Sequence, residues 1–298
     1  MIGAEGANHI LLSGGDFLPQ VNFTKMHGIG NDYVYINCFE QQIENPNELA
    51  KMMSPRRFSV GADGVILICP SDVADAKMRM FNLDGSEGKM CGNGVRCVGK
   101  FVYDNGIAHK DTVTIETLSG IKTLKITDKD GRAESITVDM GRAELSAQKI
   151  PALADCDTII DTAIIVNGED YNITAVSMGN PHAVTFCDEI DGLNLEKIGP
   201  HFEHHDMFPE QVNTEFICVI DDHTLQMRVW ERGSGETFAC GTGACAAAVA
   251  AVENGYCKRD SEITVHLVGG DLFITYTSDG TVFMRGSATK VFDGIYEY

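Results

Sequence analysis

The chain has 298 residues, of which 44 % are hydrophobic and 22 % charged, a composition typical of a soluble globular protein of about two domains. Its formal net charge of -20 argues against nucleic acid or an anionic membrane as a partner, because both would repel it. The ten cysteines are spread through a long chain without any 18-residue apolar run, which excludes a disulfide scaffold and predicts a cytoplasmic protein with no membrane span.

The first element in chain order is an extension. Residues 1 to 20 lack the basic start and the long apolar core of a secretory signal, and we predict a flexible segment with the fold beginning near Val21. A helix is expected over residues 47 to 54, with Asn47 as its N-cap.

The next stretch of the sequence predicts a strand, a loop, a cysteine and a helix in this order. The apolar run "KMRMFNL" leads into a loop with glycine and glutamate, and Cys91 stands directly before a predicted helix over 92 to 104. Asn105 and Gly106 are a typical helix stop. Short β-rich runs with an Asp-Gly turn come next. Residues 141 to 160 carry little pattern and are predicted to hold a crossover.

The same order then recurs at an offset of 149 residues. "MRMF" falls on "MRVW", and Cys91-Gly92-x-Gly94 falls on Cys240-Gly241-x-Gly243, before a second predicted helix over 241 to 253. We therefore predict an α+β protein of two pseudo-symmetric domains, each a curled, mostly antiparallel sheet or barrel around a central helix. The expected halves are 21–140 and 141–286, with a strand near 287–298 returning to the first half.

A cysteine at a helix start has a chemical use. The positive end of the helix dipole favours the thiolate, and the free N–H groups there can hold a carboxylate. Two such sites facing one cleft would place two thiols on opposite sides of one small anionic molecule. This is what inversion of a carbon centre by proton transfer needs, with a base on one face and an acid on the other.

These residues also carry a resemblance to a known family. "MHGIGNDYVYIN", "FNLDGSEGKMCGNGVRC", "MGNPHAV", "VNTEF" and "WERGSGETFACGTGACAA" together resemble diaminopimelate epimerase over nearly all of residues 21 to 298. The resemblance implies an enzyme without cofactor or metal that interconverts LL- and meso-2,6-diaminopimelate in lysine and peptidoglycan precursor synthesis. It makes Cys240 the proton acceptor and Cys91 the donor in the LL direction. The oligomeric state stays open, and a homodimer is compatible with the sequence.

The resemblance also implies the rest of the site. His182 and Glu231 would influence the pKa values of the thiols. In many members of the family a glutamine stands where this chain has Gly64, so one polar contact is missing. The residues expected to bind substrate are Asn31, Asn82, Gly92, Asn93, Asn180, Asn213, Glu231, Arg232, Gly241 and Thr242.

Other interpretations have weaker support. Proline racemases and hydroxyproline epimerases also pair two cysteines, but they typically have histidine where this chain has Asn93. The run "HFEHHDMF" does not complete a zinc ligand set. "GTGACA" matches a dinucleotide-binding pattern but does not directly follow a strand. The racemase of proline or hydroxyproline therefore stays as the alternative function.

Overall fold

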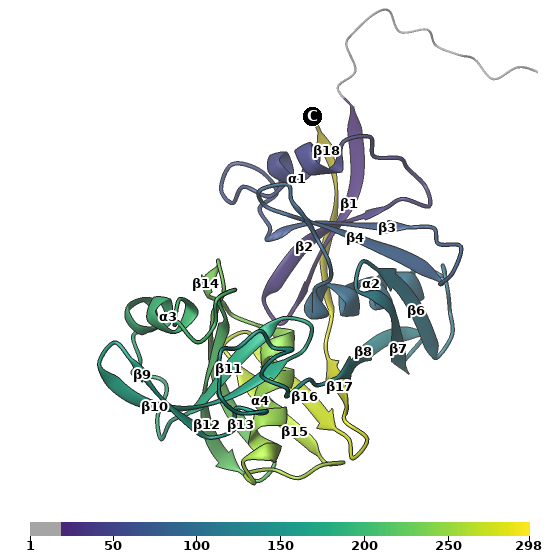
Figure 1. Ribbon diagram of the computed structural model, residues 1–298. Coiled ribbons are helices and arrows are strands. Elements are labelled where there is room, and N and C mark those ends of the chain that lie inside the picture. Colours follow the sequence, from purple (N-terminus) through teal and green to yellow (C-terminus); the bar gives the residue numbers. More distant parts are fainter. Residues whose placement is uncertain (1–18) are drawn as a thin grey trace, which may run out of the picture.

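Two lobes, each wrapped around one helix, make up the part of the chain that the structure describes, residues 19 to 298 of a computed structural model (Figure 1). The central helices are α2 (Gly92–Asp104) and α4 (Gly241–Glu253), with the bounds expected from the sequence. Both helices end at an Asn-Gly pair, and both asparagine side chains donate to a carbonyl of the last helical turn. The predicted fold class is confirmed.

The N-terminal half is a mostly antiparallel sheet in the order β1-β2-β3-β4-β6-β7-β8, in which the β2–β3 and β4–β6 pairs are parallel. Its elements are β1 (Gln20–Gly28), β2 (Asn31–Asn37), α1 (Pro46–Met53), β3 (Gly64–Cys69), β4 (Ala76–Asn82), β5 (Glu87–Gly88), α2, β6 (Thr112–Thr117), β7 (Gly120–Lys129) and β8 (Arg132–Arg142).

The C-terminal half repeats this order as β10-β11-β12-β13-β15-β16-β17, and its parallel pairs, β11–β12 and β13–β15, fall at the corresponding places. Its elements are β9 (Thr162–Val166), β10 (Glu169–Ser177), β11 (Pro181–Phe186), α3 (Leu195–Glu203), β12 (Asn213–Asp221), β13 (Thr224–Glu231), β14 (Gly235–Glu236), α4, β15 (Glu262–Leu267), β16 (Gly270–Tyr276) and β17 (Thr281–Gly286).

The last strand, β18 (Thr289–Glu297), runs from the C-terminal lobe into the other lobe (Figure 1), where it pairs antiparallel with β1. It takes the place beside β1 that β9 takes beside β10. The antiparallel pairing of β8 with β17 also joins the two halves, so one hydrogen-bonded sheet system continues through both lobes.

Small residues let each central helix approach its sheet closely. In α4 the run Ala246–Ala251 is fully buried, and its short side chains leave little distance between helix and strands. In α2, a Cβ added to Gly99 would lie 2.5 Å from a methyl carbon of Leu124, so a larger residue would require this side chain to shift. This close packing buries both helices and fixes where their N-terminal ends point.

The first short helix differs from the expectation. α1 begins at Pro46 with Asn45 as N-cap, because proline suits the first helical turn. The prediction of Asn47 as N-cap is therefore wrong, and its side chain donates instead to the Gly85 carbonyl at 2.8 Å. α3 was not predicted from the sequence, although the Asn194 side chain that caps it by accepting from Lys197 N–H is a typical start.

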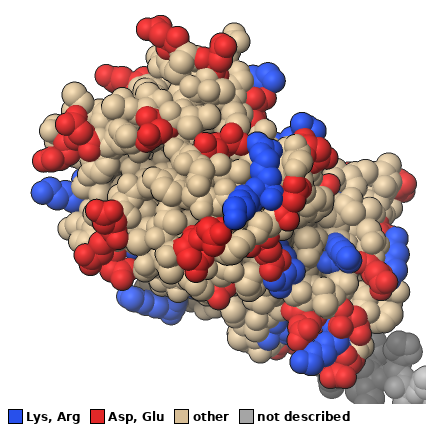
Figure 2. Space-filling view, turned by 90° about the horizontal axis from the view of Figure 1, so that it is seen from below, with Lys and Arg blue, Asp and Glu red and all other residues tan. Residues whose placement is uncertain are grey.

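The extension predicted for residues 1 to 20 lies outside the described residues except for its last two, and β1 already begins at Gln20. No helix in residues 19 to 298 has the length and apolar character needed to cross a membrane. Figure 2 shows acidic and basic side chains interspersed over one face of the molecule, so the negative charge is spread there and not gathered in one patch.

Candidate active site

The two repeat-related cysteines occupy the same place in their halves. Cys91 is the N-cap of α2 and its sulfur accepts the Gly94 N–H, while Cys240 is the N-cap of α4 and its sulfur accepts the Gly243 N–H, both at 3.3 Å. Cys97 and Cys245, six and five residues further along the chain, are fully buried.

The two helix starts meet where the halves join. A Cβ added to Gly92 would lie 3.9 Å from the Gly241 Cα, and the Asn93 side-chain amide donates to the Ala239 carbonyl at 3.2 Å. The backbones of the two helix starts therefore lie close together, and a Cβ at Gly92 or Gly241 would lie 3.1 Å from the Met284 side chain. The N-terminal ends of α2 and α4 are directed to one shared region.

A cleft of about 1470 Å³ opens at this junction, and both cysteines line it. The structure places eleven of the residues predicted for the site along its wall: Asn31, Asn82, Cys91, Gly92, Asn93, Asn180, Glu231, Arg232, Cys240, Gly241 and Thr242. The sequence did not single out several other polar residues that line it, among them Arg56, Asp63, Lys89, Lys122 and Arg142.

Two of the predicted residues lie behind the wall. His182 is completely buried, and Asn213 is 4 % exposed. The Asn213 amide donates to the Pro181 carbonyl at 2.8 Å, and its oxygen accepts the Arg232 N–H at 3.0 Å. Asn213 therefore positions the backbone of two cleft segments.

His182 links the cleft to a carboxylate that the sequence analysis missed. Its Nδ1 lies 2.7 Å from Glu215 Oε1, and its Nε2 lies 3.1 Å from Asn180 Oδ1. Glu215 is completely buried, and its Oε2 has no hydrogen-bond partner within the described residues. The offset of 149 could have found it, because Glu215 falls on the apolar Ile66 of the first half.

The electrostatic surroundings of the two thiols differ. Burial raises the pKa of Cys91, against which the backbone N–H groups of Gly94 and Asn93 act. Burial raises the pKa of Cys240 well above its usual range, and the carboxylates of Glu231 and Glu215 raise it further. Burial also raises the pKa of Glu231 itself. In the substrate-free protein these effects favour the protonated thiols.

The departure at Gly64 has a steric cause. A Cβ at this position would lie 2.1 Å from the Phe81 carbonyl oxygen and 3.0 Å from the Tyr33 ring. Gly64 is absent from the cleft wall, and the strand spacing between β3 and β4 leaves no room for a glutamine side chain.

Replacing Gly64 by alanine or glutamine is therefore expected to lower the free energy of unfolding by roughly 1–3 kcal/mol, because β3 must shift from β4. Urea unfolding followed by circular dichroism measures this change. Gly192→Ala is the control, since a Cβ there meets nothing within 4 Å, and it should change stability by less than about 0.5 kcal/mol. A Gly64→Gln protein as stable as the parent would contradict the steric explanation.

No cluster of three or more histidine, cysteine, aspartate or glutamate side chains suited to a metal ion occurs within residues 19 to 298. In the histidine-rich run, His204 contacts the Pro200 carbonyl and His205 contacts the Ile165 carbonyl. These two imidazole rings contact backbone carbonyls of α3 and of β9.

Comparison with known proteins identifies one family over most of the chain. The family model described as diaminopimelate epimerase matches residues 23–146 and 174–291. The chain is 53 % identical over 275 residues to the diaminopimelate epimerase of Acetivibrio thermocellus, covering 92 % of this chain and 98 % of that one. It is 54 % identical over 275 residues to the enzyme of the same name from Methanococcus maripaludis strain C5, covering 92 % and 99 %.

Solved structures share the fold at low sequence identity. A hydroxyproline epimerase from Agrobacterium vitis superposes with a TM-score of 0.67 at 14 % identity, covering 95 % of this chain and 92 % of that one. A phenazine biosynthesis protein of the PhzF family from Bacillus anthracis gives a TM-score of 0.65 at 16 % identity, covering 94 % and 100 %.

The family match and the curated relatives define the chain as an epimerase, and its two-lobed fold is shared with the solved structures above. Within that class the chain belongs to the diaminopimelate epimerase family, as the family match and the curated relatives show.

Proposed function

We propose that the chain interconverts LL- and meso-diaminopimelate by a two-base α-proton transfer between Cys91 and Cys240. The observation that carries the proposal is that the two thiols, each at the start of a buried helix, line one cleft from opposite halves of the molecule. In the LL direction Cys240 accepts the α-proton and Cys91 delivers one to the opposite face. In the meso direction the roles exchange.

The helix starts supply the stabilisation of the carbanion. Backbone hydrogen bonding in the helices begins with Val95 N–H to the Cys91 carbonyl and Ala244 N–H to the Cys240 carbonyl. The N–H groups of Gly92, Asn93, Gly241 and Thr242 precede these bonds, and we assign them to the reacting carboxylate. Because charge moves into this carboxylate as the proton leaves, these donors stabilise the transition state more than the ground state.

Substrate binding also prepares the base. Glu231 raises the pKa of Cys240 in the free protein. An ammonium group of the substrate held against Glu231 would neutralise that effect and ease ionisation of the thiol. We assign Arg232 to the distal carboxylate of the substrate. Further polar contacts to the substrate are assigned to Asn31, Asn82 and Asn180. From behind the cleft wall, His182 contacts Asn180, and Asn213 holds the backbone of Pro181 and Arg232.

The test is a set of parallel assays on the purified full chain without added cofactor. LL-diaminopimelate, L-proline and trans-4-hydroxy-L-proline are each incubated with the protein, and the stereochemistry of the products is followed by chiral chromatography. Conversion of LL-diaminopimelate to the meso isomer alone is expected. Turnover of proline or hydroxyproline in its place would establish the alternative function. The proposal includes a cytoplasmic role in lysine and peptidoglycan precursor synthesis.

A further inference from the structure

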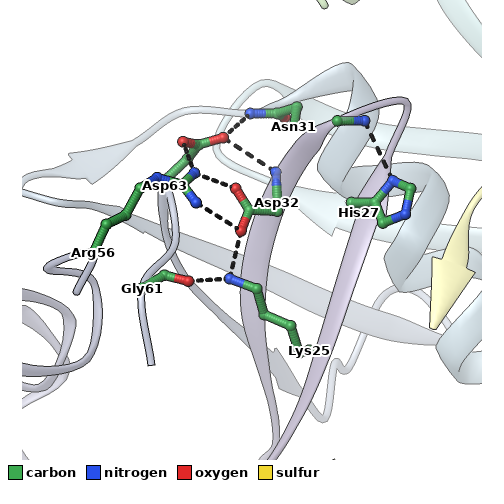
Figure 3. A network of polar contacts seen from close by, with 8 residues as sticks. Lys25, His27, Asn31, Asp32, Arg56, Gly61 and Asp63 are labelled. Atoms are coloured by element: carbon green, nitrogen blue, oxygen red, sulfur yellow. Dashed lines mark hydrogen bonds and ion pairs between the residues drawn. The ribbon is translucent and has the colours of Figure 1, made fainter. Parts of the chain in front are cut away.

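Asn31 bridges the Cys91 thiol and a charged network behind it. Figure 3 shows the charged network around Asn31. The Cys91 S–H donates to Asn31 Oδ1 at 3.1 Å, and Asn31 Nδ2 donates to Asp63 Oδ2 at 2.7 Å. The two ends of one amide group therefore face two different partners, a thiol and a carboxylate.

Asp63 is itself held in place from several sides. Its Oδ2 also accepts the Asp32 backbone N–H at 3.1 Å, and its Oδ1 accepts the Arg56 guanidinium at 2.9 Å. Arg56 forms a second ion pair with Asp32, which pairs in turn with Lys25 (Figure 3). The network fixes the Asp63 carboxylate at the start of β3.

This carboxylate determines which way the Asn31 amide faces. An ionised carboxylate only accepts hydrogen bonds, so the amide must present its NH₂ group to Asp63. The amide carbonyl is then directed to Cys91, and because a carbonyl only accepts, the thiol must keep its proton to complete the bond.

The repeat-related asparagine is oriented the other way. Asn180 Oδ1 faces His182 Nε2, and its Nδ2 faces Thr242 Oγ1 at 3.4 Å, a hydroxyl that lies 3.6 Å from Cys240 Sγ. The Asn31 carbonyl thus faces the Cys91 thiol. In the other half the Asn180 NH₂ group faces the Thr242 hydroxyl beside Cys240. The network behind each asparagine breaks the symmetry of the duplicated site.

We propose that Asp63, held by Arg56, is a positioning residue that turns the Asn31 carbonyl to Cys91 and so keeps this thiol protonated in the substrate-free protein. The proposal deepens the two-base function proposed above and rests on it. It gives Asp63 and Asn31 a role in that function, although neither residue carries the reacting proton.

Other charged or titratable groups also act on Cys91. They are Tyr33 and Tyr35 of β2, Arg96 and Cys97 of α2, and Glu231 of β13. Each of these groups is retained in every variant below, so a change in the reactivity of Cys91 reports on Asp63 and Asn31.

The experiment is a double-mutant cycle read out by alkylation. Cys240→Ser removes the second cleft thiol, and Asp63→Asn, Asn31→Ala and their combination are made in that background. The rate of iodoacetamide labelling at the Cys91 peptide is measured by mass spectrometry at pH 7. Asp63→Asn is expected to raise the rate by about 5- to 10-fold, because the freed amide can turn its NH₂ group to the sulfur and favour the thiolate.

In the Asn31→Ala background the same Asp63→Asn change should alter the rate by less than about 2-fold, because no amide is left to turn. An equal increase in both backgrounds would show that Asp63 acts through its charge or through loosened packing, and would overturn the proposal. An unchanged rate in Asp63→Asn would overturn it as well. Labelling does not need turnover, so these outcomes are separate from failure of the proposed function.

Arg56→Gln is a second variant, which keeps the Asp63 carboxylate but removes its ion pair. The Arg56 side chain is 56 % exposed. This variant should raise the labelling rate by a smaller factor and only while Asn31 is present. Thermal unfolding of each variant confirms that the compared proteins are folded.

A second pair of cysteines carries an independent inference. Cys38 directly follows β2, and Cys69 ends β3, where Asn37 and Ile68 are parallel partners and the Cys38 N–H donates to the Ile68 carbonyl at 2.8 Å. Neighbouring strands lie about 4.8 Å apart. The two side chains are half-buried and follow the same register on neighbouring strands.

The offset of 149 produces a matched pair in the same register, in which Cys187 directly follows β11 and Cys218 lies on β12. There the Cys218 thiol donates to the Asp188 carbonyl at 3.2 Å, so it is directed to the backbone. The pair differs from the first in the orientation of one thiol.

The geometry points to Cys38 and Cys69 as a dithiol site for trivalent arsenicals. An arsenoxide R–As=O forms two As–S bonds with the pair, and its oxygen leaves as water with the two thiol protons. Phenylarsine oxide is expected to protect Cys38 and Cys69 together from subsequent iodoacetamide labelling by at least about 10-fold, and Cys38→Ser should abolish the protection of Cys69. Protection that persists in Cys38→Ser, or labelling of both cysteines despite the arsenical, would overturn the assignment. Cys187→Ser is the control and should leave the protection unchanged.

Discussion

Alanine in place of either Cys91 or Cys240 is expected to lower kcat/KM for epimerisation by about 10³-fold or more. Each thiol supplies one of the two proton transfers, and a positioned acid or base contributes typically 10²- to 10⁴-fold. Circular dichroism of the product mixture or a coupled assay measures the loss. Cys156→Ala, at an exposed cysteine, is the control and should retain full activity.

The single variants should nevertheless exchange hydrogen with solvent. In Cys91→Ala the remaining Cys240 can remove and return the α-hydrogen of the LL isomer on one face, so in D₂O deuterium enters without inversion. Cys240→Ala should do the same for the meso isomer. Proton NMR of recovered substrate distinguishes the two. Exchange of both isomers by one variant, or undiminished epimerisation, would contradict the two-base proposal.

Arg96→Ala is expected to lower the free energy of unfolding by about 3–5 kcal/mol, the largest stability effect that we predict. The Arg96 side chain is completely buried. It donates to the Gly92 carbonyl, to Asn93 Oδ1 at 2.8 Å and to the Ser287 carbonyl, so it ties the start of α2 to the segment between β17 and β18. Alanine would leave a cavity and three unsatisfied acceptors.

The Arg96 guanidinium is closely packed against two glycines. A Cβ added to Gly28 would lie 3.0 Å from its Nη2, and one added to Gly286 would lie 3.1 Å from its Nε. Guanidinium chloride unfolding measures the effect, with the exposed Arg132→Ala as the control at less than about 0.5 kcal/mol. A loss for Arg96→Ala no larger than that of the control would contradict the structural role.

Much of the architecture could be predicted because its determinants are local or repeated. The helices over 92–104 and 241–253 were found from a cysteine-glycine start and an Asn-Gly stop, and the offset of 149 predicted the two-lobed fold. α3 was missed and the start of α1 was misplaced by one residue, because a short helix gives weak periodicity. The pairing of β18 with β1 joins residues near the two ends of the described chain, so its register depends on the tertiary fold and on no local pattern.

The sequence by itself determined the thiols and the glycines at the helix starts, because these functions depend on residue type and on neighbours within one turn. Only the tertiary structure decided what surrounds each thiol. Asn31 and Cys91 are 60 positions apart, His182 and Glu215 are 33 apart, and Asn93 and Ala239 are 146 apart. Hydrogen bonds of this kind form when the curled sheets bring distant strands to one helix end, and no local pattern encodes which partner arrives there.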